Sequence, residues 1–176
     1  MPERRADGPP DREERRRILR ERMGGYRIDR GGRWWYRGAP LDLEIERQFA
    51  EGLEQFGDGR LRVMCEGEPC YVTCEDAPFV VRDLRWERAR AGGSAARDRI
   101  LLSLSGGIEE PLDPATLHLD ARDVLYCRVR SGTLEARFGP RAATRIADGM
   151  RPHRDGWAID LEGRTWVIAA RPAVDP

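Results

Sequence analysis

The sequence contains no lysine, so all 31 of its basic side chains are arginines, and 31 acidic residues balance them. A formal net charge of +0 argues against the broad basic surface that general nucleic-acid binding requires. No stretch of the 176 residues approaches the ~20 apolar residues that cross a bilayer, and residues 1–25 lack the apolar run of a signal peptide. Four cysteines are too few for a scaffold held together by disulfides. We therefore expect a cytoplasmic protein with no membrane segment.

The chain is long enough for one ordinary domain or for two small subdomains that share a core. Residues 1–30 stand apart, because they contain ten arginines against seven acids, a surplus of three positive charges. We interpret this segment as a charged, flexible N-terminal arm. A helix over residues 11–23 that docks on a partner or on nucleic acid is the alternative interpretation.

Residues 31–87 are predicted to form a first structural unit. After a turn and a short aromatic strand, apolar residues recur at helical spacing: Leu41, Ile45, Phe49, Leu53 and Phe56. We expect a helix over residues 41–56, with Pro40 at its first position and the glycines at 57 and 59 at its end. Alternating apolar residues then predict a β-hairpin from strands 61–65 and 70–74, and a further strand over residues 79–86.

Residues 88–98 are small and polar and are predicted to be a linker. A second unit follows over residues 99–172, with strands expected at 100–104, 124–129 and 134–138. Pro140 is suited to open a short helix, and a second hairpin turns at Glu162 and Gly163. Residues 106–120 are rich in turn-forming residues, and residues 173–176 are a tail.

The two units share one order of elements. Residues 34–40 and residues 134–140 each precede a helix and then a hairpin, with an offset of 100 residues at Pro40 and Pro140 and of 96 at Gly67 and Gly163. The pattern predicts an α+β fold. Its two repeated strand–helix–β-hairpin units would form two small mixed, mainly antiparallel sheets.

The cysteines and histidines carry no recognisable catalytic or metal-binding pattern. Cys65, Cys70 and Cys74 lack the close pair spacing of structural zinc sites, and free cysteines usually pack as small apolar groups. A nucleophilic pair of Cys127 and His118 would lack a third, orienting group. We therefore predict no catalytic residue, no metal site and no cofactor.

The corner at residues 75–79 and the aromatic run at residues 34–36 are the strongest candidates for a binding surface. Aromatic residues and arginine dominate the energetics of protein interfaces, although the aromatic run also suits core packing. In the corner, Asp76 is expected to accept hydrogen bonds from backbone amides two residues on, and acid–base work by Glu75 and Asp76 is the alternative. The candidate surface comprises Trp34, Trp35, Tyr36, Arg37, Glu75, Asp76, Pro78 and Phe79.

Residues 30–170 resemble a bacterial family, domain of unknown function 1285. The resemblance lies in the sequence GRWWYRGAP, the helix and hairpin after it, and above all the run from Glu75 to Val81. It also covers residues 110–113, 125–130 and 134–136. It implies a fold with repeated structural units, no established activity and a role in signalling. Residues 64–69 and 103–107 depart from the family pattern, which puts the family's partner in question here.

These observations favour a non-enzymatic binding or signalling-type module that recognises a protein or a small ligand. One alternative is an enzyme that uses Glu75 and Asp76 in a cleft beside an arginine. Another is a nucleic-acid-associated protein that binds through its N-terminal arm, although nucleic acid is the less favoured partner. The sequence does not indicate an oligomeric state.

Overall fold

The structure is a computed structural model that describes residues 25–57, 59–65, 67–87 and 99–170. Most of the predicted arm, the linker at 88–98 and the tail at 173–176 lie outside the described residues. The helical elements are α2 (Leu43–Glu51), α3 (Pro140–Ala147) and the short 3₁₀ helices η1 (Ser105–Gly107) and η2 (Pro114–Thr116). The first seven strands are β1 (Tyr26–Ile28), β2 (Trp34–Tyr36), β3 (Ala39–Pro40), β4 (Glu54–Gln55), β5 (Leu61–Cys65), β6 (Glu68–Cys74) and β7 (Phe79–Glu87). The remaining strands are β8 (Arg99–Leu104), β9 (Glu109–Pro111), β10 (His118–Leu119), β11 (Leu125–Val129), β12 (Leu134–Phe138), β13 (Met150–His153), β14 (Gly156–Leu161) and β15 (Arg164–Ala170).

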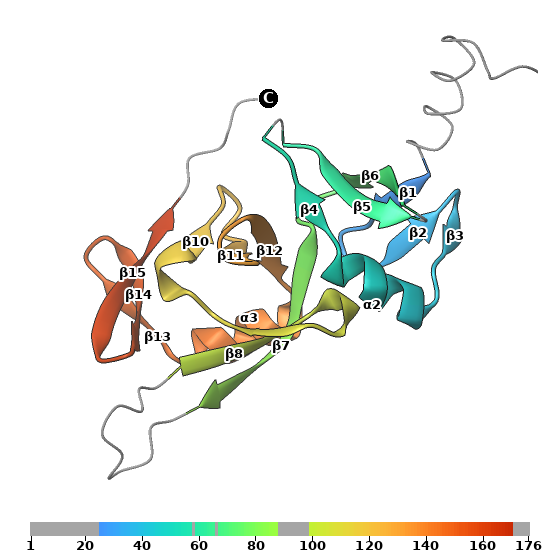
Figure 1. Cartoon of the computed structure of the whole chain (residues 1–176). Helices are drawn as coiled ribbons and strands as arrows, with labels where there is room; N and C mark the ends of the chain where they lie inside the picture. Colours follow the sequence, from blue (N-terminus) through green and yellow to red (C-terminus); the bar gives the residue numbers. More distant parts are fainter. Residues whose placement is uncertain (1–24, 58, 66, 88–98, 171–176) are drawn as a thin grey trace, which may run out of the picture.

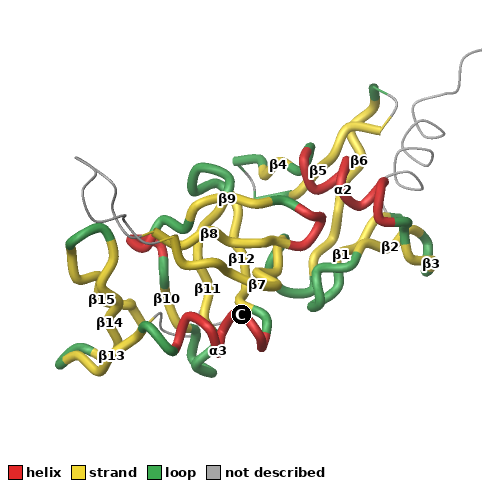
Figure 2. Tube along the Cα trace, turned by 90° about the horizontal axis from the view of Figure 1, so that it is seen from below, coloured by secondary structure: helices red, strands yellow, loops and turns green. Residues whose placement is uncertain are grey.

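The strands form two mixed sheets, which confirms the predicted α+β class. The first sheet has the order β3-β2-β1-β6-β5-β4, and the second has the order β13-β14-β15-β10-β11-β12-β7-β8-β9. Most neighbouring strands pair in antiparallel orientation, but three pairs are parallel: β1–β6, β10–β15 and β7–β12. The first sheet and α2 occupy one side of the molecule, and β13–β15 lie at the other (Figure 1). Seen from below, α3 lies along one side of the second sheet, and it contacts β7 (Figure 2).

Strand β1 lies inside the segment that the sequence assigned to the N-terminal arm. It sits between β2 and β6, and Ile28 is fully buried. The first sheet therefore begins at Tyr26, before residue 30. The strand is only three residues long, with Arg27 at its centre, and its neighbours in the sheet come from residues 34–36 and 72–74. Local alternation over three residues is too short a signal to reveal it.

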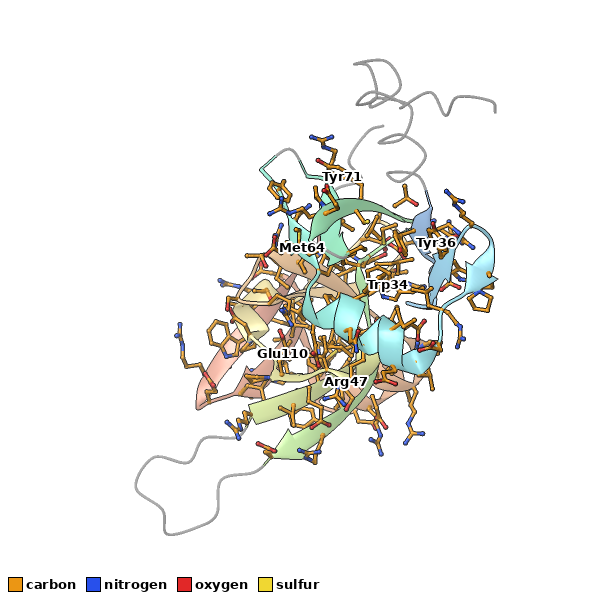
Figure 3. The ribbon with its side chains drawn as sticks, turned by 45° about the vertical axis from the view of Figure 1, so that its right-hand side comes forward. Trp34, Tyr36, Arg47, Met64, Tyr71 and Glu110 are labelled. Carbon is orange, nitrogen blue, oxygen red and sulfur yellow. The ribbon has the colours of Figure 1, made fainter. Side chains whose placement is uncertain are left out.

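Helix α2 is shorter than predicted, and the face that it buries only partly matches the predicted one: Phe49 packs on the core and Leu53, just after the helix, is buried. Asp42 caps it by accepting hydrogen bonds from the backbone amides of residues 44 and 45, so Pro40 lies outside it, in β3. Its buried residues are Glu46 and Ala50, whereas Ile45 and Phe56 are exposed. Glu46 points inward because its carboxylate accepts a hydrogen bond of 2.7 Å from the backbone amide of Trp34. Figure 3 shows Trp34 close beside α2.

The predicted hairpin of β5 and β6 is confirmed, but the strand after it leaves the first sheet. Strand β7 pairs with β8 and β12 in the second sheet. The first unit therefore does not extend to residue 87, because the corner at 75–78 carries the chain from one sheet to the other. The sequence also missed the short strands β9, β10 and β13.

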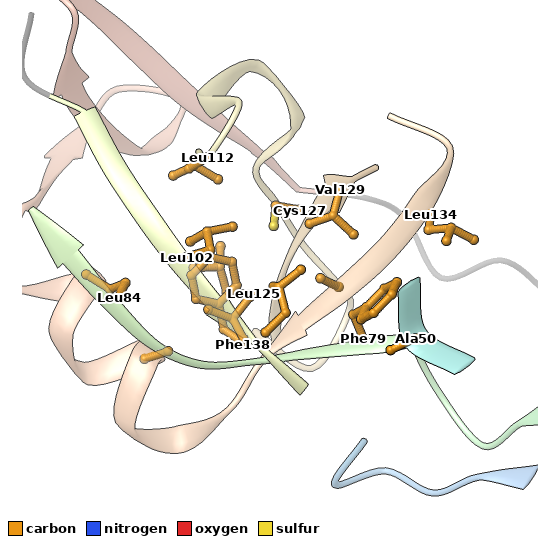
Figure 4. Close-up of a cluster of buried hydrophobic side chains, with 14 of the residues drawn as sticks. Ala50, Phe79, Leu84, Leu102, Leu112, Leu125, Cys127, Val129, Leu134 and Phe138 are labelled. Atoms are coloured by element: carbon orange, nitrogen blue, oxygen red, sulfur yellow. The ribbon is translucent and has the colours of Figure 1, made fainter. Parts of the chain in front are cut away.

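One continuous core lies between the two sheets and their helices. Phe79, Leu102, Leu134 and Ala50 contribute to it, and each is at most 1% exposed. Figure 4 shows these side chains together with Cys127, which is also buried. Helix α3 begins at Pro140 as predicted. No helix in the described part of the chain is long and apolar enough to span a bilayer.

The two halves meet where α2 packs on η1. Gly106 in η1 has a φ of +76°, and a Cβ added there would lie 2.4 Å from the Cβ of Ala50. The side chain of Arg130, in the β11–β12 turn, donates a hydrogen bond of 2.7 Å to the carbonyl oxygen of Glu51 at the end of α2. These contacts of Gly106 and Arg130 fix the first half against the second. Within the second half, the hydroxyl of Ser105 accepts a hydrogen bond of 3.0 Å from the backbone amide of Val80, which holds η1 on β7.

Candidate functional site

The corner between β6 and β7 anchors the first sheet to the second. The Glu75 carboxylate forms an ion pair with the guanidinium of Arg27 on β1. The hydroxyl of Tyr126 on β11 donates a hydrogen bond of 2.9 Å to Asp76 Oδ1. Arg137 Nε on β12 lies 3.3 Å from Asp76 Oδ2, an ion pair without the alignment of a hydrogen bond. Asp76 therefore contacts the second sheet. The sequence had predicted instead that it would accept hydrogen bonds from backbone amides of its own turn.

The eight residues of the predicted surface do not form one surface. Trp34 and Phe79 are each 1% exposed and belong to the core. Tyr36 lies among the aromatic rings near α2, with its ring centroid 4.6 Å from that of Tyr26 (Figure 3). Trp35 lies on the opposite face of the first sheet, and Arg37 is exposed in the turn that follows. Of these eight residues, Asp76 and Pro78 border a cavity that the described part of the chain forms between the two halves.

Two adjoining cavities lie between the halves of the molecule. The larger has a volume of about 950 Å³ and is bordered by residues 53–56, by β9 and by the β11–β12 turn. The smaller, of about 490 Å³, lies between the outer face of β5 and β6 and the polar face of β11 and β12. Gln55 and Arg128 line both cavities, so the two adjoin, and we name them together the interface groove. The corner residues Asp76 and Pro78 border its smaller part.

The interface groove carries charges of both signs, most of which are already engaged within the protein. Glu54 and Arg62 form an ion pair of 3.1 Å on one wall. On the other wall, Glu110 accepts a hydrogen bond of 2.9 Å from the backbone amide of Arg130. Glu135 Oε1 lies 3.2 Å from Nε2 of the buried His118. The groove is thus lined by charged and apolar side chains together, and several of its charged groups are held by contacts inside the protein.

The cysteines lie apart from any reactive arrangement. Burial raises the pKa of the Cys127 thiol, and burial also raises the pKa of Cys74 to about 11. Both are therefore protonated at neutral pH and are poor nucleophiles. No group of three histidine, cysteine or acidic side chains in the described ranges is placed to hold a metal ion.

Tyr126 gives the corner a pH-dependent signature. Burial, reinforced by its hydrogen bond to Asp76, raises the pKa of Tyr126 to about 12 from the ordinary value of 10. The raised pKa means that the folded state favours the neutral phenol of Tyr126. The neutral phenol therefore contributes its full stabilisation below pH 10, and this stabilisation is lost as the pH rises to about 12. We expect Tyr126→Phe to flatten the fall in unfolding free energy over this window, measured by urea titration at successive pH values. A fall of the same steepness in the variant would show that other groups cause it.

Sequence reasoning missed the side chains that matter most in the groove. Arg128 and Glu135 face each other across β11 and β12, and Tyr126 pairs with Arg137 in the same way. The alternation of apolar and polar residues in residues 125–129 and 134–138 contained this signal, because it places the polar side chains on one face of the sheet. What the pattern could not show is that this face lies opposite β5 and β6.

Comparison with known proteins gives a fold but no activity. No family model matches the sequence, and no curated protein matches it. A DUF1285 family protein from Silicibacter pomeroyi has a similar structure, with a TM-score of 0.66 and 21% identity over 82% of this chain and 79% of that chain. A DUF1285 family protein from Shewanella baltica is similar with a TM-score of 0.56 and 23% identity, over 70% of this chain and 90% of that chain. The resemblance predicted from the sequence is confirmed as a shared fold, and this chain has the fold of the DUF1285 family proteins.

Proposed function

We propose that the protein is a binding module that takes a short polypeptide segment of a partner protein into the interface groove. The observation that carries the proposal is that the two cavities adjoin at Gln55 and Arg128. The larger cavity alone, at about 950 Å³, lies at the upper end of the range for small-molecule sites. A pair of adjoining open cavities suits an extended chain, and linings that mix polar and apolar groups are usual in interfaces that form and dissociate.

An enzymatic role is less well supported. Asp76 does lie beside Arg137 at the edge of a groove, which is the geometry that the enzymatic alternative required. However, one of its oxygens accepts the hydrogen bond from Tyr126 and the other faces Arg137. We therefore assign Asp76 to fixing the corner. Glu75, paired with Arg27, does not line the groove, so the two carboxylates do not act on one site.

The proposed partner is a protein in the cytoplasm. Nucleic acid is disfavoured because the groove carries acidic as well as basic side chains, for example Glu110 and Asp113 beside Arg130. The four cysteines are free thiols, which is consistent with a reducing compartment.

Selection of peptides from a random display library against the immobilised full chain tests the proposal. Gln55 is exposed and lines both cavities, so Gln55→Trp should block the groove without disturbing the core. We expect peptides selected on the wild-type protein to bind this variant at least about tenfold more weakly. Gln48→Trp is the matched control, because Gln48 is exposed on α2 and lines neither cavity. Equal binding to all three proteins would place the peptide site elsewhere, and a failure to select any peptide would contradict the proposed function.

We further propose that the two halves are copies of one ancestral unit. The strand order β3-β2-β1-β6-β5-β4 has a counterpart in β12-β11-β10-β15-β14-β13, with a helix after β3 and after β12. The parallel pair β1–β6 corresponds to the parallel pair β10–β15. On this correspondence β2 matches β11 and β3 matches β12. The structural alignment of the halves therefore differs from the sequence alignment, which set residues 34–40 against residues 134–140.

The loops after β1 and β10 support this correspondence in detail. Asp29 Oδ1 accepts hydrogen bonds from the backbone amides two and four residues on, and Asp120 Oδ1 does the same. Each loop also has a positive φ at the third residue after the aspartate, at Gly32 and Asp123. Such agreement in the local hydrogen bonding is more specific than the turn-forming glycines on which the sequence comparison relied.

A further inference from the structure

Arg128 is a cation of the interface groove for which the described residues supply no charged partner, and it is the one that lines both cavities. Its side chain is exposed. The guanidinium donates a hydrogen bond of 3.2 Å to the carbonyl oxygen of Gly132, and no described carboxylate forms an ion pair with it. A guanidinium has five N–H donors in a planar fork, so most of its donors remain available to a ligand.

The neighbour that would ordinarily pair with Arg128 is held elsewhere. Glu135 lies directly opposite Arg128 on β12, and opposite charges in this position usually attract. Instead, Glu135 Oε1 lies 3.2 Å from Nε2 of His118. The His118 ring is itself fixed, because Nδ1 lies 3.1 Å from the carbonyl oxygen of Thr116 and the ring stacks on Tyr126. Because Nδ1 faces a carbonyl oxygen, Nε2 donates to Glu135 in the imidazolium form of His118, and in that form His118 competes with Arg128 for the Glu135 carboxylate.

We propose that Arg128 is the anchor for a carboxylate of the bound ligand, and that His118 is a positioning residue that keeps this anchor available by holding Glu135. This inference rests on the proposed function and adds to it the chemical group that the groove recognises. In a peptide ligand, the carboxylate is an acidic side chain or the C-terminal carboxylate. One guanidinium can bind a carboxylate through two parallel hydrogen bonds.

The surroundings favour a carboxylate over a phosphate. Asp76 and Glu135 border the same cavity as Arg128, and Glu110 and Asp113 border the adjoining one. These carboxylates oppose a dianion more strongly than a monoanion, because the electrostatic repulsion scales with the ligand charge. Arg60 also lines the smaller cavity, where its guanidinium lies 4.8 Å from the Tyr71 ring centroid.

The experiment is a titration of the ¹⁵N-labelled full chain, followed by NMR, with N-acetylglycine as the carboxylate probe. N-acetylglycinamide, which has the same body without the charge, and inorganic phosphate are the comparison probes. We expect N-acetylglycine to shift the Arg128 Nε–Hε signal and the amides of residues 71–76 and 128–135 saturably. Both comparison probes should bind the wild-type protein at least about tenfold more weakly than N-acetylglycine does. N-acetylglycine should also bind the Arg128→Gln variant at least about tenfold more weakly than it binds the wild type.

Two further variants test His118. His118→Phe retains an aromatic ring but cannot hold Glu135, so we expect binding of the probe to weaken about tenfold with Arg128 intact. The double variant His118→Phe/Glu135→Gln should bind within about twofold of the wild type, because the competing carboxylate is gone. If His118→Phe does not fold, the Glu135→Gln variant tests whether Glu135 competes with the ligand for Arg128. This variant should bind the probe at least as tightly as the wild type.

The outcomes separate this inference from the proposed function. Equal affinity for N-acetylglycine and its amide, or weaker binding to Glu135→Gln, would overturn the carboxylate anchor. Display peptides that still bind in the groove would then leave the proposed function intact. Conversely, if no peptide is selected but the probe binds at Arg128, the anchor stands and the peptide-binding function fails.

Discussion

Replacing Gly106 by alanine is expected to lower the free energy of unfolding by about 3–5 kcal/mol, because the new methyl group adds a clash to a strained backbone conformation. The φ of Gly106 is +76°, and its added Cβ would lie 2.4 Å from that of Ala50 on α2. Since Ala50 is buried where the two halves meet, the clash must move α2 or η1. Urea unfolding monitored by tryptophan fluorescence measures the loss.

Gly107→Ala is the matched control for this substitution. Gly107 has nearly the same backbone angle, a φ of +73°, but nothing lies within 4 Å of its added Cβ. The Gly107→Ala variant should lose only the unfolding free energy that the left-handed backbone conformation costs an alanine, about 1–2 kcal/mol. If the two variants lose equal stability, the contact between α2 and η1 is not tight, and this account of how the halves are held together is wrong.

The substitution Phe79→Ala is expected to destabilise the protein by about 3–5 kcal/mol, the usual cost of emptying the site of a buried phenylalanine. Phe79 is the first residue of β7, pairs with Ala136 and is 1% exposed within the core (Figure 4). It holds the position at which the chain passes from the first sheet to the second. Thermal or urea unfolding of the variant checks the magnitude.

Phe79→Leu should lose only about 1–2 kcal/mol, because it retains most of the apolar volume. A loss below about 1 kcal/mol for Phe79→Ala would mean that this site is not packed as the structure shows. Because Phe79 does not line the groove, Phe79→Leu should still bind the display peptides. Loss of peptide binding in a folded Phe79→Leu variant would instead assign this corner a direct binding role.

The elements with strong local patterns could be predicted from the sequence. The hairpins at 61–74 and 156–170 were recognised from alternation and turn residues, and α3 from Pro140 and its apolar face. Strand β1 was missed because its burial depends on partners far along the chain. The buried face of α2 was only partly predicted, because Glu46, a charged residue, is drawn inward by the backbone amide of Trp34. No local pattern distinguishes such a glutamate from an exposed one.

The candidate site was less predictable than the fold. Of the residues proposed from sequence, Asp76 and Pro78 lie at the groove, whereas the aromatic run is divided between the core and the far face of the first sheet. The groove forms because β7 joins the second sheet and brings the polar face of β11 and β12 opposite β5 and β6. That arrangement depends on long-range pairing, so single-sequence patterns could not place Arg128 within it.

The most direct measurement for the central claim locates a bound display peptide on the protein. Amide signals of the ¹⁵N-labelled full chain would be followed by NMR while a selected peptide is added. The account predicts shifts concentrated at residues 53–56, 71–76, 109–113 and 128–135, which border the interface groove. Saturable shifts confined to other surfaces, such as the exposed start of α2 or the β14–β15 hairpin, would contradict it.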